Sequence, residues 1–178
     1  MAAIVEFNEI IDEVLLSYQG QLNLDYTKYR NHVYRVLNLA IILSNPDEEN
    51  YKALSIAAAF HDLGIWTANT FDYLAPSVDL AHNYLAQNEL SHLESLVTEI
   101  INNHHKLSAY KSNNIVEPFR KADLIDLSFG LIGYGIDAKT LKAVNKQFPS
   151  CGFHRFIIMQ GLKNTFRHPL RPLPMMRL

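Results

Sequence analysis

The chain has 178 residues, of which 48% are hydrophobic. This length fits one domain of ordinary size, and the apolar share is normal for a folded protein and too high for a disordered one. The formal net charge of −2 gives no overall attraction to nucleic acid or to a membrane surface, so we expect neither as a partner.

Apolar residues recur at three- and four-residue spacing along most of the chain, which predicts an all-α fold. Turns or loops are predicted at 44–47 and 67–74, a polar connection at 111–114, and an extended, Pro-punctuated tail from His168 onward. Strand-like alternation, internal repeats and linkers are absent from the sequence, so we predict a single-domain helical bundle over residues 1–178. Helices are predicted over residues 2–19, 25–43, from 48 toward 64, 76–88, 90–104, 118–125, 138–147 and 152–166.

The sequence also bears on the compartment. Its first residues carry acids where a secretory signal peptide would carry basic residues, and no apolar run approaches the roughly 20 residues that span a bilayer. The single cysteine, Cys151, leaves no partner for an intrachain disulfide and no cysteine-based zinc site. We therefore expect a cytoplasmic protein.

The dipeptide His61-Asp62 stands out because of its surroundings. It follows the apolar run from Ala57 to Phe60 and precedes Leu63. Burying an imidazole and a carboxylate together costs several kcal/mol unless something compensates them, and a divalent cation compensates both. The dipeptide alone is a weak signal, and its apolar setting gives it weight.

Two further residues complete a candidate metal site. His32 shares the inner face of its predicted helix with Val36, although a single inward His is more often a hydrogen-bonded core residue. Asp123 has apolar neighbours four residues away on either side, whereas Asp126, one turn later, is its rival. For either acid, the alternative is a solvated carboxylate beside nearby basic residues.

Two imidazoles and two carboxylates form a mixed nitrogen and oxygen site. Such a set suits one Mn²⁺, Fe²⁺, Co²⁺, Ni²⁺ or Zn²⁺ ion, and it suits Mg²⁺ less well. Bundle cores commonly house such sites. Four protein ligands on an octahedral ion leave room for water, whose pKa can fall from near 15.7 to about 7, and this chemistry predicts hydrolysis.

The order of these residues resembles the HD superfamily of metal-dependent phosphohydrolases, in which a His, a His-Asp doublet and a later Asp bind the metal in an α-helical core. The surrounding sequence is similar too, with HVYRV from His32, AAAFHDLG around the doublet, IINNHH at 100–105 and KADLID around Asp123. The resemblance spans about residues 28–128. It implies an HD-type core on which the first helix, the last helices and the Pro-rich tail pack, with the metal held by His32, His61, Asp62 and Asp123.

The sequence departs from some family members in two places. Where those members carry a Glu three positions after the doublet Asp, this chain has Ile65, so the proton-transfer residue is unassigned. Dinuclear members have further His ligands after the doublet, and residues 65–81 contain none, which favours a single metal. His104 and His105 resemble the family's His-His element, and with Asp62 they are the candidate catalytic residues.

The sequence alone does not decide the role of the His-His element. One of the two, with His104 favoured, is expected to face the site as a substrate contact, a water-orienting base or a second-metal ligand. The alternative is a His that interacts favourably with a helix C-terminus. Candidate contacts to an anionic small-molecule substrate are the basic residues Arg35, Lys106, Lys111, Arg120 and Lys121. Scattered surface charges are the usual explanation for the last four, and a structural ion pair explains Arg35 equally well.

The sequence is compatible with three functions. The first is hydrolysis of a phosphoester, such as a nucleotide or another small phosphorylated metabolite. The second is hydration of a small molecule, because the superfamily also includes hydratases such as cyanamide hydratase, which residues 71–85 resemble. The third is a non-catalytic regulatory module with a structural metal. A phosphate substrate should need a cationic pocket, whereas a small neutral substrate should need a tight apolar one.

Overall fold

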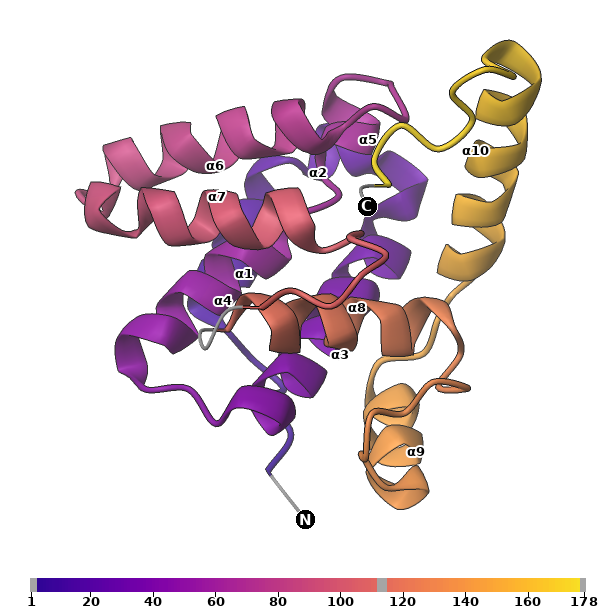
Figure 1. The fold of residues 1–178 in the computed structure, drawn as a ribbon. Coiled ribbons are helices and arrows are strands. Elements are labelled where there is room, and N and C mark those ends of the chain that lie inside the picture. The colour runs from indigo at the N-terminus through magenta and orange to yellow at the C-terminus, as the bar shows by residue number, and fades with distance from the viewer. Residues whose placement is uncertain (1–2, 112–114, 177–178) are drawn as a thin grey trace.

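In the computed structural model, residues 3–111 and 115–176 are described, so residues 112–114 of the predicted polar connection lie outside the described part. The described residues form helices and connecting turns without a strand, which confirms the predicted all-α class (Figure 1). The elements in chain order are α1 (Glu9–Ser17), α2 (Gln19–Leu22), the 3-10 helix η1 (Asn23–Asp25), α3 (Tyr26–Ser44), α4 (Glu48–Phe60), α5 (Gly64–Thr67), α6 (Leu74–Gln87), the 3-10 helix η2 (Ser91–Leu93), α7 (Glu94–Asn103), α8 (Val116–Leu127), α9 (Ala138–Gln147) and α10 (Phe153–Arg167).

The centre of the bundle is formed by α3 and α4. Helix α3 packs most extensively on α8 and also on α4, while α4 is covered by α1, α6 and α7. The side chains of Ala57, Ala58 and Ala59 are all fully buried, and their small size lets neighbouring helices approach α4 closely. Since α3 has neighbours on several sides, every residue from Asn31 to Ala40 is buried.

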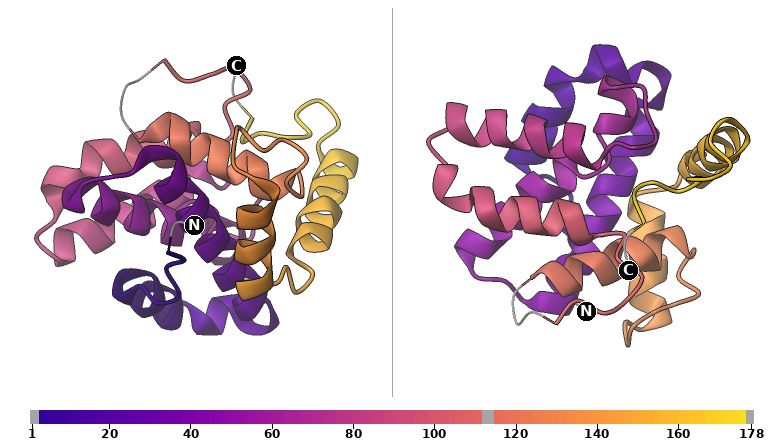
Figure 2. Two further views of the ribbon diagram at one scale, coloured as in Figure 1. Left: turned by 90° about the horizontal axis from the view of Figure 1, so that it is seen from below. Right: turned by 45° about the horizontal axis from the view of Figure 1, so that its top comes forward.

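The remaining helices surround this centre. Helices α6 and α7 form an antiparallel pair on one side of the bundle, and α9 and α10 follow one another on the other side (Figure 1). Two further views show α10 at the edge of the molecule, with the tail returning from its end toward the bundle (Figure 2). None of the helices that the structure describes has both the length and the apolar character needed to cross a membrane.

Two of the predicted elements differ in the structure. The first helix starts at Glu9 rather than at residue 2, because the Asn8 side chain caps it by accepting the Ile11 N–H at 3.0 Å. The preceding segment is extended and pairs with Asn38, whose side chain accepts the Val5 N–H.

The prolines predicted an extended tail after α10, but the tail instead makes two turns. The Arg171 N–H donates to the His168 carbonyl, and the Met176 N–H donates to the Leu173 carbonyl. The Asn164 side chain also donates to the Pro172 carbonyl, which ties the tail back to α10. Prolines fix their own φ and stop a helix, but they are as compatible with turns as with an extended chain. The prediction of an extended tail was therefore wrong.

Candidate metal centre

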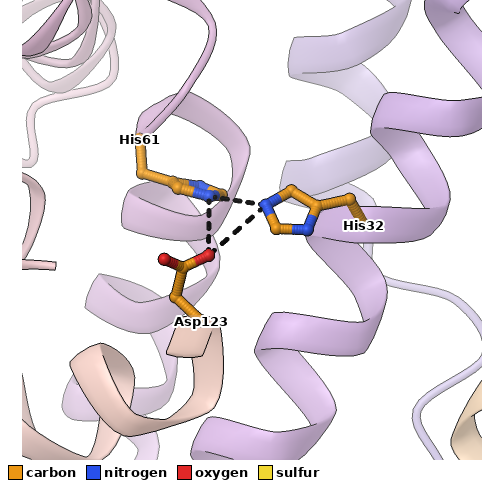
Figure 3. A group of neighbouring side chains, drawn as sticks. All are labelled: His32, His61 and Asp123. Atoms are coloured by element: carbon orange, nitrogen blue, oxygen red, sulfur yellow. Dashed lines mark hydrogen bonds and ion pairs between the residues drawn. The ribbon is translucent and has the colours of Figure 1, made fainter. Parts of the chain in front are cut away.

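Three segments of the bundle bring the four predicted ligands together. His32 lies in the middle of α3, His61 and Asp62 follow the end of α4, and Asp123 lies on α8. All four are at most 2% exposed. His32, His61 and Asp123 point toward one another from separate helical segments (Figure 3). The close packing of α3 with α4 and α8 therefore fixes the positions of these side chains.

The distances between the ligand atoms are short. The Nε2 atoms of His32 and His61 lie 2.9 Å apart, and each lies 3.6 Å from Asp62 Oδ2. Asp123 Oδ1 lies 3.6 Å from the His32 Nε2 and 3.9 Å from the His61 Nε2. His32, His61 and Asp123 thus form one group that could hold a metal ion, and Asp62 belongs to an adjoining group with His61 and His104.

Hydrogen bonds on the far side of each ring fix which nitrogen faces the cluster. His61 Nδ1 lies 2.8 Å from the Ala58 carbonyl, to which it can only donate. His32 Nδ1 lies 2.7 Å from Asp126 Oδ2 and donates to that carboxylate. When both rings are neutral, each Nε2 therefore carries a lone pair and no hydrogen, and the two lone pairs face each other. A positively charged species, either a proton or a metal ion, must then lie between them.

The pKa values of the two histidines differ because their surroundings differ. Burial lowers the pKa of His32, but hydrogen bonds to Asp126 and Asp62 raise it to about 9. Burial together with the nearby charges of His104 and His32 lowers the pKa of His61 to about 3. Burial also raises the pKa of Asp123, since it penalises the charged carboxylate.

One proton cannot satisfy the whole cluster. Asp62 Oδ1, both carboxylate oxygens of Asp123 and the Nε2 of His104 are buried and have no hydrogen-bond partner among the described residues. Such orphaned groups are rare in native proteins and cost about 1–3 kcal/mol each, or more when charged. Four electron-pair donors converging without a hydrogen donor are the arrangement that a divalent cation compensates, so the cluster could hold a metal ion.

Arg35 and Asp126 support this cluster from behind. Arg35 donates from Nε to Asp126 Oδ1 at 2.5 Å and from a terminal nitrogen to Oδ2 at 2.9 Å, and both residues are buried. Its other terminal nitrogen donates to the Phe148 carbonyl. The Phe153 ring stacks on the His32 ring, with centroids 3.9 Å apart. Asp126, weighed in the sequence as a rival of Asp123, therefore orients His32, and Arg35 neutralises Asp126.

His104 and His105 form the edge of the cluster next to Asp62 and Asp123. The His104 Nε2 lies 3.4 Å from Asp62 Oδ1, and its Nδ1 donates to the Ile101 carbonyl. His105 Nδ1 lies 3.4 Å from Asp123 Oδ2. The hydroxyl of Tyr73 lies 2.6 Å from the His105 Nε2. Both histidines thus reach the cluster, and the hydroxyl of Tyr73, which is not among the predicted site residues, contacts His105.

The other predicted residues lie differently. Arg120 and Lys121 both pair with Glu117 on their own helix, at 2.7 and 3.6 Å, and the Arg120 guanidinium also donates to the Lys106 carbonyl. Lys111 is exposed. Ile65 is 6% exposed and belongs to an apolar cluster, so its position provides no proton-transfer group. Of the predicted substrate contacts, Arg35, Arg120 and Lys121 are directed toward carboxylates of the protein rather than toward the cluster.

Comparisons of the chain with models of protein families, with curated proteins and with solved structures found no match.

Proposed function

We propose that the protein is a metal-dependent hydrolase of the HD type, in which His32, His61, Asp62 and Asp123 hold one divalent ion. The observation that carries the proposal is the set of four buried donor atoms without a hydrogen-bond partner, next to two imidazole nitrogens that face each other at 2.9 Å. The mixed donors favour Mn²⁺, Fe²⁺, Co²⁺, Ni²⁺ or Zn²⁺ over Mg²⁺. When bound in such a site, a divalent ion polarises a substrate oxygen and lowers the pKa of a coordinated water.

The protein's own residues supply orientation and proton transfer. Asp126 and the Ala58 carbonyl hold the rings of His32 and His61 in the tautomer that presents Nε2 to the cluster. His105 and Tyr73 lie on the side of the cluster that faces Asp62, joined by a 2.6 Å contact. Some members of the HD superfamily have a Glu at the position of Ile65, where it transfers protons. We assign this proton transfer to the pair of His105 and Tyr73. His104, which lies closer to Asp62, positions the water or the substrate.

Phosphoester hydrolysis is the reaction that the resemblance favours. The test uses metal-free protein that has been reloaded separately with each of the five ions and assayed against a panel of phosphomonoesters and phosphodiesters. Metal content is measured by elemental analysis. Asp123→Ala should lose both bound metal and turnover, while the exposed Asp72→Ala serves as the matched control and should keep both. A metal-loaded protein that releases no phosphate from any member of the panel would contradict phosphoester hydrolysis.

Hydration of a small neutral molecule is the second candidate, and one observation favours it. The cavity next to Asp62 and His105 is lined mainly by apolar side chains, and no lysine or arginine of the described residues lines it. Small nitriles and cyanamide, assayed with the same reloaded protein, separate the two reactions. Turnover of these compounds without release of phosphate from the panel would select hydration over phosphoester hydrolysis.

A further inference from the structure

A cavity of about 210 Å³ opens beside the metal centre. Asp62, Tyr73 and His105 form its polar end, and Asp62 and His105 are members of the cluster itself. The rest of its wall is formed by apolar side chains, together with one glycine: Phe71, Leu127, Ile157, Ile158, Gly161, Leu173, Met175 and Met176. The polar end next to the cluster and the apolar wall therefore belong to one cavity.

Most of the apolar wall comes from α10 and the tail, which lie outside the part of the chain that resembles the HD superfamily. The ring of Phe156 on α10 stacks on Trp66 with centroids 5.1 Å apart. Met175 is only 4% exposed and packs in a small apolar cluster with the loop that precedes α6. These contacts hold Met175 and the adjoining part of α10 beside the metal centre, whereas Ile158, Leu173 and Met176 are exposed, so the cavity is open to solvent on that side.

No lysine or arginine of the described residues lines this cavity, and the two buried arginines are paired with carboxylates elsewhere. Arg35 pairs with Asp126, and Arg120 pairs with Glu117. On α10, Arg155 precedes the wall residues and is exposed, while Lys163 and Arg167 line another cavity, which Phe71 also borders. An anionic group deep in the apolar cavity would thus lose its hydration without meeting a compensating cation among the described residues.

We infer that this cavity binds an uncharged apolar substituent of the substrate, whose reacting group lies at the end formed by Asp62, Tyr73 and His105. The inference rests on the proposed function and narrows its substrate class. A volume of about 210 Å³ is below the roughly 300–1,000 Å³ of sites for drug-sized ligands, so the substituent is a short alkyl chain or a single ring. A nucleoside or a sugar, which carries many polar groups, would leave most of them unpaired against this wall.

The test measures binding rather than turnover. Straight-chain alkyl hydroxamates, which chelate a divalent ion through two oxygens of their head group, are titrated calorimetrically into the zinc-loaded protein. Affinity should rise about fourfold with each methylene group from the acetyl to the pentanoyl compound. The hydroxamate that ends in a carboxylate, made from succinic acid, should bind at least tenfold more weakly than the uncharged compound of equal length.

Gly161 provides the variant that fills the cavity. A Cβ atom added there would lie 3.8 Å from the Phe71 ring and 4.0 Å from Leu173, which is ordinary contact, so the helix accepts a side chain at this position. Gly161→Leu should abolish the gain in affinity with chain length, and Gly161→Ala should reduce it. Met159→Leu, on the exposed side of the same helix, should retain the full gain. A wild-type protein with no dependence on chain length, or an equal dependence in Gly161→Leu, would overturn the inference.

A second measurement separates this inference from the proposed function. In protein labelled at its methionine methyl groups, hexanamide added without metal should shift the Met175 signal and leave that of Met159 unchanged. If the protein binds no divalent ion but the Met175 signal shifts, the proposed function fails and the apolar site stands. If the ion and acetohydroxamate bind but Met175 does not respond and longer chains bind no better, the apolar site fails and the metal centre stands.

Discussion

Replacing Asp123 by Asn removes a charge while keeping the shape of the side chain. Both carboxylate oxygens of Asp123 are buried without a hydrogen-bond partner among the described residues, and burial raises its pKa. In the metal-free protein the burial of this carboxylate is therefore a cost, which the nearby His104 and His32 offset only in part. We expect Asp123→Asn to leave the free energy of unfolding of the metal-free protein unchanged or raised, while it weakens metal binding.

The size of the effect follows from binding linkage. A ligand at 1,000 times its Kd stabilises a folded protein by about 4 kcal/mol, and a hundredfold loss of affinity removes about 2.7 kcal/mol of this. For a chain of 178 residues, 1 kcal/mol corresponds to roughly 2–4 °C in Tm. The metal should thus raise the Tm of the wild type by about 8–16 °C and that of Asp123→Asn by no more than about 6 °C.

Calorimetric unfolding with and without the chosen ion measures both effects. Asp72→Asn is the matched control, because Asp72 is exposed and its ion pair with Arg171 spans 3.5 Å at the surface. This control should show the full metal-dependent shift. A metal-free Asp123→Asn protein that unfolds several degrees below the metal-free wild type, with an undiminished shift on adding metal, would refute the reasoning.

Three further changes test other parts of the site. Asp126→Asn should weaken metal binding about 10–100-fold, measured by competition with a chelator, because Asp126 orients the His32 ring. Tyr73→Phe should lower turnover while metal content stays close to that of the wild type, since the hydroxyl contacts His105, which is not one of the four proposed ligands. Glu117→Gln should cost about 1–2 kcal/mol at pH 7, measured by urea unfolding, because Glu117 loses its charged bonds to Arg120. Burial raises the pKa of Glu117 but those bonds lower it, so the difference should vanish as the pH falls from 4.5 through this lowered pKa.

The fold class could be predicted from the sequence because helical periodicity is a local property. The 3.6-residue repeat in α3 and α4 predicted both helices within a few residues. The errors arose where one side chain or a distant contact decided the structure. Asn8 caps α1 and bonds to Ser55, 47 residues away, and no local pattern contains that partner.

More of the His/Asp cluster than of the rest of the site could be predicted from the sequence, for a physical reason. A buried charge needs compensation, so the polar pair His61-Asp62 within an apolar run pointed to a shared partner before any distance was known. The roles of Arg35 and Tyr73 depend on contacts with Asp126 and His105, which are 91 and 32 residues away in sequence. An arginine that follows a ligand by one turn has the same local pattern whether it binds a substrate or a carboxylate of the protein.

The proposed metal centre and the apolar cavity draw on different parts of the chain, and this separation leads to a prediction for substitutions in α10. The four proposed ligands lie between residues 32 and 123, within the stretch that resembles the HD superfamily, and most of the apolar wall comes from α10 and the tail. The two parts meet at Phe153, which stacks on the His32 ring, and at Phe148, whose carbonyl accepts a bond from Arg35. Because these contacts hold the base of α10 against the cluster, substitutions farther along α10 should alter which substituent binds without altering the ion. Substitutions at Phe153 should alter both, since its ring forms one face of the packing around His32.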